Sequence, residues 1–523
     1  MFRKESFLLF ILMLSSFVLN IISNGYQLSG DERASLSSAA GAGITMNRFE
    51  GSSSFRYTQA APLEKNIFTQ YDYGKRNIFV NVIRSTVNFD SGNMVAYHLM
   101  LHGWLNFLGI SVFNARLLAA LLAVITVLFT YLLVKKLTEN ISIAFMASAI
   151  LAMHPLLLHH AHMARGYAAS LCFTTAAAYV VLHLTDTSIS SGKRIWLYII
   201  FGILSTLAIL SHYLSVAVFT FFALWLITRK NFFKQHLPGA VLALLIVTSV
   251  IGLWLKKGGS EGLDEMRKID AWYLKNTSEQ VHTSPRSLVE GAAQQLLAIF
   301  GNYGQYLGFR LRSFAFLLLF PLAAVVFSFR HFKNLPNRNV PRFLMGAVIT
   351  LILFSTMLAI KAGHTTSFTA RYGIYAIPFA SALLGVALHA VVSGALSKMK
   401  KIVVSFSLLA TFIIFIFSAI PAYTGIAATY NSNPELHKHV LNFSLDKYYS
   451  KEYYEPTAKK IEQIYADGDT VIYNDWNTAQ VINLFLHDSN KTIVQKVNLN
   501  SGQRISYFEK ASGSYKVISE TEK

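Results

Sequence analysis

Long apolar runs separated by short charged or polar stretches make up most of the chain. An α-helix needs about 17 to 25 mostly apolar residues to cross the hydrocarbon core of a bilayer. We count about eleven runs near that length, of which the fifth and sixth are short. They lie at residues 6–22, 117–134, 141–158, 166–192, 195–211, 214–228, 237–255, 314–329, 343–360, 372–392 and 402–420. The pattern predicts an α-helical polytopic membrane protein.

The loops between these runs alternate in charge. Basic residues gather at every second loop, as at Lys135–Lys136, Lys193–Arg194 and residues 398–401, whereas the intervening short turns carry them only at their rims. Positive loops stay in the cytoplasm. We therefore expect a multi-pass plasma (inner) membrane protein with a cytoplasmic N-terminus and, for an odd number of spans, an outer C-terminus. A cleaved signal peptide fits less well, because no small-x-small cleavage site precedes Asp31.

Two stretches are too long to be simple connections and are predicted as large outer loops, at about residues 25–113 and 257–312. The first loop ends in residues 93–107, where apolar residues recur at helical spacing and Tyr97 and Trp104 are aromatic residues typical of a membrane interface. This segment is predicted as an amphipathic helix that lies in the outer interface.

The last hundred or so residues differ in character from the rest. Residues 456–465 have the pattern of an amphipathic helix with Pro456 in its first turn. Residues 470–473 and 492–497 are typical of strands, and residues 478–485 of a helix between them. We predict a transmembrane domain over residues 1–421 and a small outer α/β domain over residues 422–523.

Composition supports the membrane assignment. With 53% hydrophobic and 14% charged residues, the chain is too apolar for an ordinary soluble protein. The net charge of +19 does not indicate a nucleic-acid partner, because the basic residues are dispersed at the ends of the apolar runs. The one cysteine, Cys172, lies inside such a run, which excludes a disulfide framework and a cysteine-based metal site.

Candidate chemical groups collect on the predicted outer side. Asp31 and Glu32 follow the first run by about ten residues, and Arg165, Lys361 and Arg371 stand at the outer ends of later runs. Arginine offers paired donors to phosphate oxygens, and a carboxylate beside it can take a proton from a hydroxyl group. This combination suits a reaction on a lipid-anchored phosphate.

Four segments also resemble a known family. They are Asp31–Glu32 after the first run, residues 105–118 entering the second run, His154–Tyr167 between the third and fourth, and Thr369–Tyr372 entering the tenth. In order and placement they are similar to the GT-C glycosyltransferases that use polyprenyl-phosphate sugars, in particular to protein O-mannosyltransferases and lipid A aminoarabinose transferases. The resemblance covers roughly residues 1–420.

The resemblance implies an inverting transfer from a polyprenyl-phosphate sugar to a hydroxyl group on a lipid, glycan or protein. It implies that Asp31 is the catalytic base, with Glu32 beside it, and leaves the sugar open. The other candidate site residues fall into two groups. The donor phosphate group comprises Arg165, Arg371, Tyr372 and Lys361, and the supporting or acceptor group comprises Tyr167, Arg116, Asp90 and His98. One departure is that residues 92–97 replace the Pro-Pro-Leu-Tyr-like start of the interfacial helix in many relatives.

Other interpretations stay open at this stage. The acidic pair could cap a helix, and the arginines could anchor the chain at lipid headgroups. No cofactor is expected, although histidine pairs can bind a divalent metal. The histidines in question are His98, His102, His159, His160 and His162. A lipid or solute transporter is the alternative function, although transporters keep ionisable residues near the midplane of the membrane.

Overall fold

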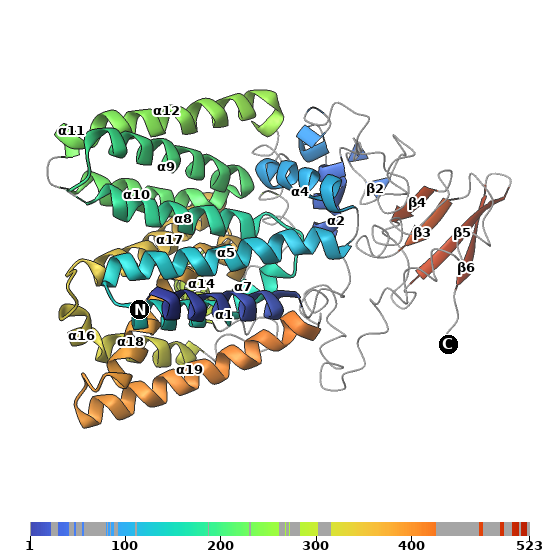
Figure 1. Ribbon diagram of the computed structural model, residues 1–523. Helices are drawn as coiled ribbons and strands as arrows, with labels where there is room; N and C mark the ends of the chain where they lie inside the picture. Colours follow the sequence, from blue (N-terminus) through green and yellow to red (C-terminus); the bar gives the residue numbers. More distant parts are fainter. Residues whose placement is uncertain are drawn as a thin grey trace. The chain divides into compact units, whose positions relative to one another are not determined.

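Figure 1 shows the computed structural model of the chain. It describes residues 2–21, 30–40, 47–48, 55–56, 80, 82–83, 85–87, 93–109, 112–186, 188–229, 232–260, 267, 271, 283–301, 315–424, 470–473, 492–495, 505–511 and 514–519. The chain divides into two compact units. The first comprises Met1–Asn24, Ala119–His162 and Gly166–Tyr430, and the second comprises Gly25–Leu118, Met163–Arg165 and Asn431–Lys523.

The first unit is helical throughout its described residues. Its longer helices are α1 (Phe2–Ile21), α5 (Val112–Thr138, whose first turns belong to the second unit), α6 (Ile141–Ala152), α7 (Pro155–Ala161), α8 (Tyr167–Leu184), α9 (Ser191–Ser211), α10 (Val216–Ile227), α12 (Leu237–Trp254), α14 (Pro285–Ile299), α15 (Leu319–Phe327), α17 (Val340–Ala362), α18 (Ile377–Val392) and α19 (Lys398–Thr424). Its shorter elements are η1 (Tyr213–Ser215), α11 (Phe232–Gln235), η2 (Leu255–Gly259), η6 (Ala315–Leu318), α16 (Phe329–Lys333), η7 (Thr365–Phe368) and η8 (Ala370–Ala376).

Eight helices in the described residues are long and apolar enough to span a bilayer, or nine if a bent pair counts as one span. The chain is therefore an integral multi-pass membrane protein, and the described residues support eight or nine of the eleven predicted spans. A helix forms at each predicted span, and at two of them the described helix is shorter than a full span. The segment Tyr213–Ile227 and the segment from Ala315 to Phe327 reach only about 20 Å, at 1.5 Å per residue, against a core of about 30 Å.

The bent pair consists of α6 and α7, which meet at an angle of 57°. His154 lies between them, and its side chain accepts a hydrogen bond from the backbone N–H of Leu156 at 3.2 Å. Pro155 occupies the first position of α7, where its lack of an N–H group costs no helical hydrogen bond. The predicted third span is thus interrupted at the start of the His154–Tyr167 segment.

Small residues let the helices of the first unit approach closely. Gly385 of α18 faces Ala147 of α6, and a Cβ atom at Gly385 would lie 2.8 Å from the Ala147 backbone nitrogen. Gly202 of α9 likewise faces the backbone of Ala243 in α12. Large apolar side chains such as Leu244 and Ile416 point outward and are exposed, as is normal for a surface that faces lipid.

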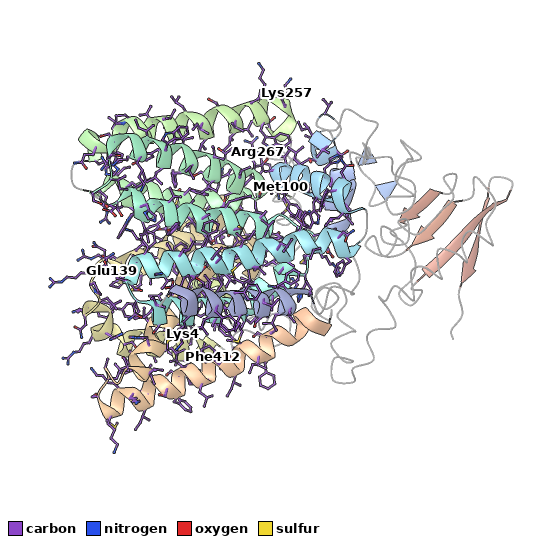
Figure 2. All side chains as sticks on the ribbon, in the orientation of Figure 1. Lys4, Met100, Glu139, Lys257, Arg267 and Phe412 are labelled. Atoms are coloured by element: carbon purple, nitrogen blue, oxygen red, sulfur yellow. The ribbon has the colours of Figure 1, made fainter. Side chains whose placement is uncertain are left out.

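Figure 2 shows the two ends of these helices, with Glu139 beyond one end of α5 and Lys257 at the opposite end of the helical unit. At the Glu139 end, the Glu5 carboxylate of α1 accepts hydrogen bonds from Tyr131 at 2.6 Å and from Lys135. The predicted cytoplasmic basic residue Lys135 therefore ties α5 to the first helix.

The second unit contains α2 (Gly30–Ala40), α4 (Val95–Leu108) and a six-stranded sheet. The predicted interfacial helix over residues 93–107 corresponds to α4. The sheet has the order β1 (Asn47–Arg48), β2 (Phe55–Arg56), β4 (Thr492–Gln495), β3 (Thr470–Tyr473), β5 (Ile505–Ala511) and β6 (Ser514–Ser519).

Strands form at both positions that the sequence predicts in the C-terminal region, because β3 and β4 lie there and pair in parallel. The antiparallel pair β5–β6 was not anticipated. The predicted helices at residues 456–465 and 478–485 lie outside the described residues. The domain boundary at residues 421 and 422 stays a prediction.

Candidate active site

The acidic pair, Asp31 and Glu32, lies in the first turn of α2. Glu32 is buried, and its Oε1 and Oε2 atoms accept hydrogen bonds from Nε and Nη2 of Arg116 at 2.7 and 2.8 Å. Oε1 also accepts a hydrogen bond from the backbone N–H of Ala164 at 2.9 Å. Both oxygens of Glu32 are therefore engaged by protein donors. The side chain of Asp31 lies outside the described part of the chain.

Arg116 stands in the first turns of α5, and the connection from α4 fixes its place. Trp104 Nε1 donates to the backbone oxygen of Asn114 at 2.8 Å. The amide group of Asn114 in turn donates to the backbone oxygens of Leu108 and Gly109, each at 2.9 Å. These hydrogen bonds hold the turn between α4 and α5. They thereby fix the start of α5, from which the Arg116 side chain reaches Glu32.

Arg165 also belongs to this group. Its guanidinium group is buried, and Nη1 donates to the Ser35 hydroxyl of α2 at 3.1 Å. Tyr97 of α4 lies close enough for its pKa to respond to the charges of both Glu32 and Arg165. Burial raises the pKa of the Tyr97 phenol, and the Glu32 carboxylate raises it further. We call Glu32, Ser35, Tyr97, Arg116 and Arg165 the acidic cluster.

The histidines of α4 hold this helix in place. His98 Nδ1 lies 3.0 Å from the Thr86 hydroxyl, and His102 Nδ1 lies 2.7 Å from the backbone oxygen of Ala39 in α2. Burial lowers the pKa of His98 well below its usual value, and the nearby Arg165 charge lowers it further. His98 is therefore a neutral, buried ring near the acidic cluster.

The described residues give no support to a metal site at the histidines, because within them no group of three or more His, Cys, Asp and Glu side chains is placed to hold an ion. Asp90, the predicted supporting acid, lies outside the described ranges.

A second group of predicted residues meets within the first unit. The Tyr167 ring at the start of α8 lies 4.5 Å from the His160 ring and 4.7 Å from the His212 ring, measured between centroids. The His212 ring in turn lies 5.9 Å from both Tyr372 and Tyr375 of η8. We call these five residues the aromatic cluster. It joins the His154–Tyr167 segment to the Thr369–Tyr372 segment, which are more than two hundred residues apart in the sequence.

Two predicted cations lie in the same unit but in different settings. The Arg371 guanidinium group lies over the Tyr372 ring, with 5.1 Å between its carbon and the ring centroid. Such stacking restricts the rotamers of the arginine and adds a cation–π attraction. Lys361 lies in the last turn of α17 and is exposed. Arg371 is therefore held by an aromatic contact, whereas Lys361 is exposed.

One buried polar residue near η8 was missed by the sequence analysis. Gln295 of α14 is fully buried, and a Cβ atom at Gly373 of η8 would lie 3.5 Å from its Cγ atom. The sequence signal that could have found it is the spacing of four between Gly291, Gln295 and Ile299, which puts an amide on the packed stripe of a helix.

Comparison with known proteins gives one family match. Residues 103–255 match the family described as dolichyl-phosphate-mannose-protein mannosyltransferase (PMT). No curated protein matches the chain.

Solved structures share its fold. A crystal structure of ArnT from Cupriavidus metallidurans bound to undecaprenyl phosphate matches with a TM-score of 0.51 and 13% identity, over 91% of this chain and 84% of that one. The apo form of the same protein matches with a TM-score of 0.51 and 11% identity, over 91% of this chain and 84% of that one.

A structure of the oligosaccharyltransferase AglB from Archaeoglobus fulgidus, in complex with an inhibitory peptide and a dolichol-phosphate, has a TM-score of 0.44 and 14% identity, over 94% of this chain and 64% of that one. Because this score is low, the shared fold rests on ArnT. The family match and the shared fold confirm the predicted resemblance to the GT-C class.

Proposed function

We propose that this chain, which is a membrane glycosyltransferase of the GT-C class, moves a sugar from a polyprenyl-phosphate donor to a hydroxyl acceptor at the outer face of the membrane. In this proposal the Asp31 carboxylate takes the proton of the acceptor hydroxyl. The acceptor oxygen attacks the anomeric carbon, and the bond from that carbon to the phosphate oxygen breaks on the opposite face. The products are the inverted glycoside and polyprenyl phosphate.

The observation that carries the choice of base is the state of Glu32. A carboxylate that accepts two hydrogen bonds from one guanidinium group and a third from a backbone N–H is held in a single geometry. Moving such a group towards a substrate would break the buried pair, which is costly. We therefore assign Glu32 a positioning role for α2 and keep the base for Asp31, its neighbour in the same helical turn.

The donor phosphate is assigned to cations. The leaving phosphate develops negative charge in the transition state, so fixed positive groups beside it lower the barrier. Arg165 brings a buried guanidinium group to the acidic cluster, and Arg371 brings one that is stacked on Tyr372. Lys361 is a weaker candidate because its exposed side chain is free to reach lipid headgroups instead.

The decisive experiment compares purified wild-type protein with Asp31→Asn and Glu32→Gln, using a panel of polyprenyl-phosphate sugars with a membrane extract as the source of acceptors. We expect wild-type protein to release polyprenyl phosphate and Asp31→Asn to lose about 10² to 10⁴-fold in rate while keeping its melting temperature. Glu32→Gln should lose stability as well as rate.

Turnover that survives in Asp31→Asn would remove Asp31 as the base. A wild-type protein that binds no donor and releases no product would contradict the transferase, and flux of the same lipids across vesicles would then favour a transporter. For Arg371, the variant Arg371→Ala should weaken binding of polyprenyl phosphate itself. Unchanged affinity would make Arg371 a membrane anchor.

A further inference from the structure

Gln295 is a buried amide without a partner. Its side chain is fully buried in α14, and neither Nε2 nor Oε1 finds a hydrogen-bond partner among the described residues. Most buried polar groups in proteins are paired, and each unpaired one costs on the order of 1–3 kcal/mol. A leucine or methionine at this position would avoid that cost. The presence of an amide therefore suggests that a ligand forms hydrogen bonds with it.

The position of Gln295 is set by tight packing against η7 and η8. One turn earlier in α14, a Cβ atom at Gly291 would lie 2.3 Å from the Phe368 ring of η7. Further along α14, the close approach depends on a glycine of η8. A Cβ atom at Gly373 would lie 3.0 Å from a side-chain atom of Ile299 and 3.5 Å from one of Gln295. Gly373 directly follows Arg371 and Tyr372, so Gln295 lies beside the segment assigned to the donor.

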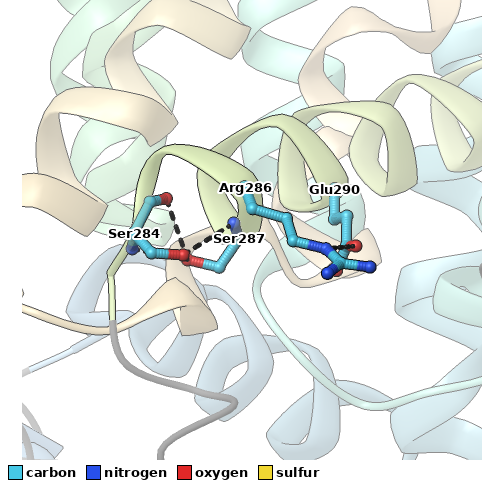
Figure 3. A network of polar contacts seen from close by, with 4 residues as sticks. All are labelled: Ser284, Arg286, Ser287 and Glu290. Carbon is cyan, nitrogen blue, oxygen red and sulfur yellow. Dashed lines mark hydrogen bonds and ion pairs between the residues drawn. The ribbon is translucent and has the colours of Figure 1, made fainter.

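Both ends of α14 are fixed. At its start, Ser284 accepts a hydrogen bond from the Ser287 backbone N–H at 3.1 Å, and the Ser287 hydroxyl accepts one from the Ser284 backbone N–H at 2.7 Å (Figure 3). At its end, His154 Nε2 lies 3.1 Å from the Ile299 backbone oxygen. Hydrogen bonds therefore hold α14 at both ends, through its own capping box at the start and through the bend before α7 at the end. They fix the position of Gln295 between them.

We propose that Gln295 binds hydroxyl groups of the donor sugar and sets which sugar is accepted. An amide offers donors on nitrogen and an acceptor on oxygen, so it can donate to one sugar hydroxyl while it accepts from its neighbour. A phosphate group offers only acceptor oxygens, so it could pair with the amide nitrogen but would leave the buried amide oxygen without a donor. The chemistry of Gln295 thus matches the neutral, polyhydroxylated part of the donor, whereas Arg371 matches the charged part.

This inference rests on the proposed function, and the test separates the two. We would measure the binding of bare polyprenyl phosphate and of a panel of polyprenyl-phosphate sugars that differ in the configuration at single carbons. The proteins are wild type, Gln295→Met, Gln295→Asn and the control Gln294→Met, which changes the neighbouring, half-buried glutamine of the same helix.

We expect Gln295→Met to bind the preferred sugar donor about 10 to 100-fold more weakly, since the site is built to pair with hydroxyl groups. Its affinity for bare polyprenyl phosphate should be unchanged, and its preference among epimeric sugars should shrink. Gln295→Asn should keep part of the preference, because it retains the amide on a shorter stem. The control should behave as wild type.

Folding does not obscure the result, because Gln295→Met removes no hydrogen bond to a described residue and should melt at the wild-type temperature or above. Wild-type protein that prefers one sugar donor, together with an identical preference in Gln295→Met, would overturn the sugar-binding role and leave the transferase intact. Wild-type protein that binds no donor would overturn both proposals.

Discussion

Glu32 and Arg116 form a buried ion pair between residues 84 positions apart in the sequence, with side chains almost fully removed from solvent. Removing one member of such a pair leaves the other as an unpaired buried charge. Breaking a buried pair in this way typically costs about 3–5 kcal/mol, whereas replacing both members by apolar residues is often neutral.

We therefore expect Glu32→Leu and Arg116→Met to lower the stability of the protein by about 3 kcal/mol each. The double variant should recover at least half of the combined loss. Thermal unfolding of the four proteins in one detergent checks this, with loss of activity expected in all three variants. Additive losses in the double variant would contradict a direct interaction between the two side chains.

His98 gives a pH dependence whose sign can be worked out. Its ring is buried, and burial holds its pKa well below the value of about 6.5 that it has in an unfolded chain. At a pH above about 6.5 the ring is neutral in the folded and in the unfolded protein, so His98 does not change the free energy of unfolding with pH there. Below this pH, the unfolded chain takes up a proton that the folded protein resists, so stability falls as the pH falls.

We expect the melting temperature of wild-type protein to drop between pH 7.5 and pH 5.5 by more than that of His98→Gln, which keeps an amide near the Thr86 hydroxyl. The difference between the two proteins isolates His98 from the other histidines. Parallel curves for the two proteins would contradict the assignment.

Among the elements, the contact between α6 and α18 depends on a glycine. A Cβ atom at Gly385 would lie 2.9 Å from the Ala147 Cα atom, and a helix backbone cannot move aside as a flexible side chain can. We predict that Gly385→Ala lowers stability by about 1–3 kcal/mol.

The matched control is Gly252→Ala in α12, where nothing lies within 4 Å of an added Cβ atom. Because alanine favours the helix, that substitution should leave the melting temperature unchanged or raise it. Equal effects of the two substitutions would show that packing does not distinguish them.

The apolar runs predicted every described helix that is long and apolar enough to cross a membrane, but two of the runs correspond to shorter described helices. At residues 214–228 the run is apolar throughout, yet the preceding helix ends at Ser211 and the turn at residues 213–215 takes the chain into α10, which is only 12 residues long. Hydropathy does not report where a helix begins inside an apolar run.

The sequence predicted which residues belong to the candidate site, but only some of the roles of these residues. Arg116 was predicted as a support, but nothing local in the sequence indicates that it pairs with Glu32. Gln295 went unnoticed because residues 287–299 read as a moderately apolar stretch. Both cases depend on contacts between distant segments, which a single sequence does not contain.

For the whole molecule, orientation in the membrane is the prediction with the widest consequences. Ser260 at the end of the predicted seventh span and Ser397 before α19 are both exposed. In a Cys172→Ser background, Ser260→Cys should react with an impermeant maleimide on intact cells, and Ser397→Cys only after permeabilisation.

The two positions serve as controls for each other, since one labelling experiment reports both sides. Reversed labelling would contradict the outer-face transfer.

The short apolar segments Tyr213–Ile227 and Ala315–Phe327 bear on the lipid that surrounds the protein. Leu224 and Leu319 in these segments are exposed apolar residues, so lipid tails must cover elements shorter than the hydrocarbon core. Hydrophobic mismatch of this kind is relieved when the bilayer thins locally, at a fraction of a kcal/mol per Å. We therefore expect the bilayer to be thinner beside these two segments than beside α5 and α19, which are 27 residues long each, so that the lipid headgroups there lie closer to the middle of the bilayer.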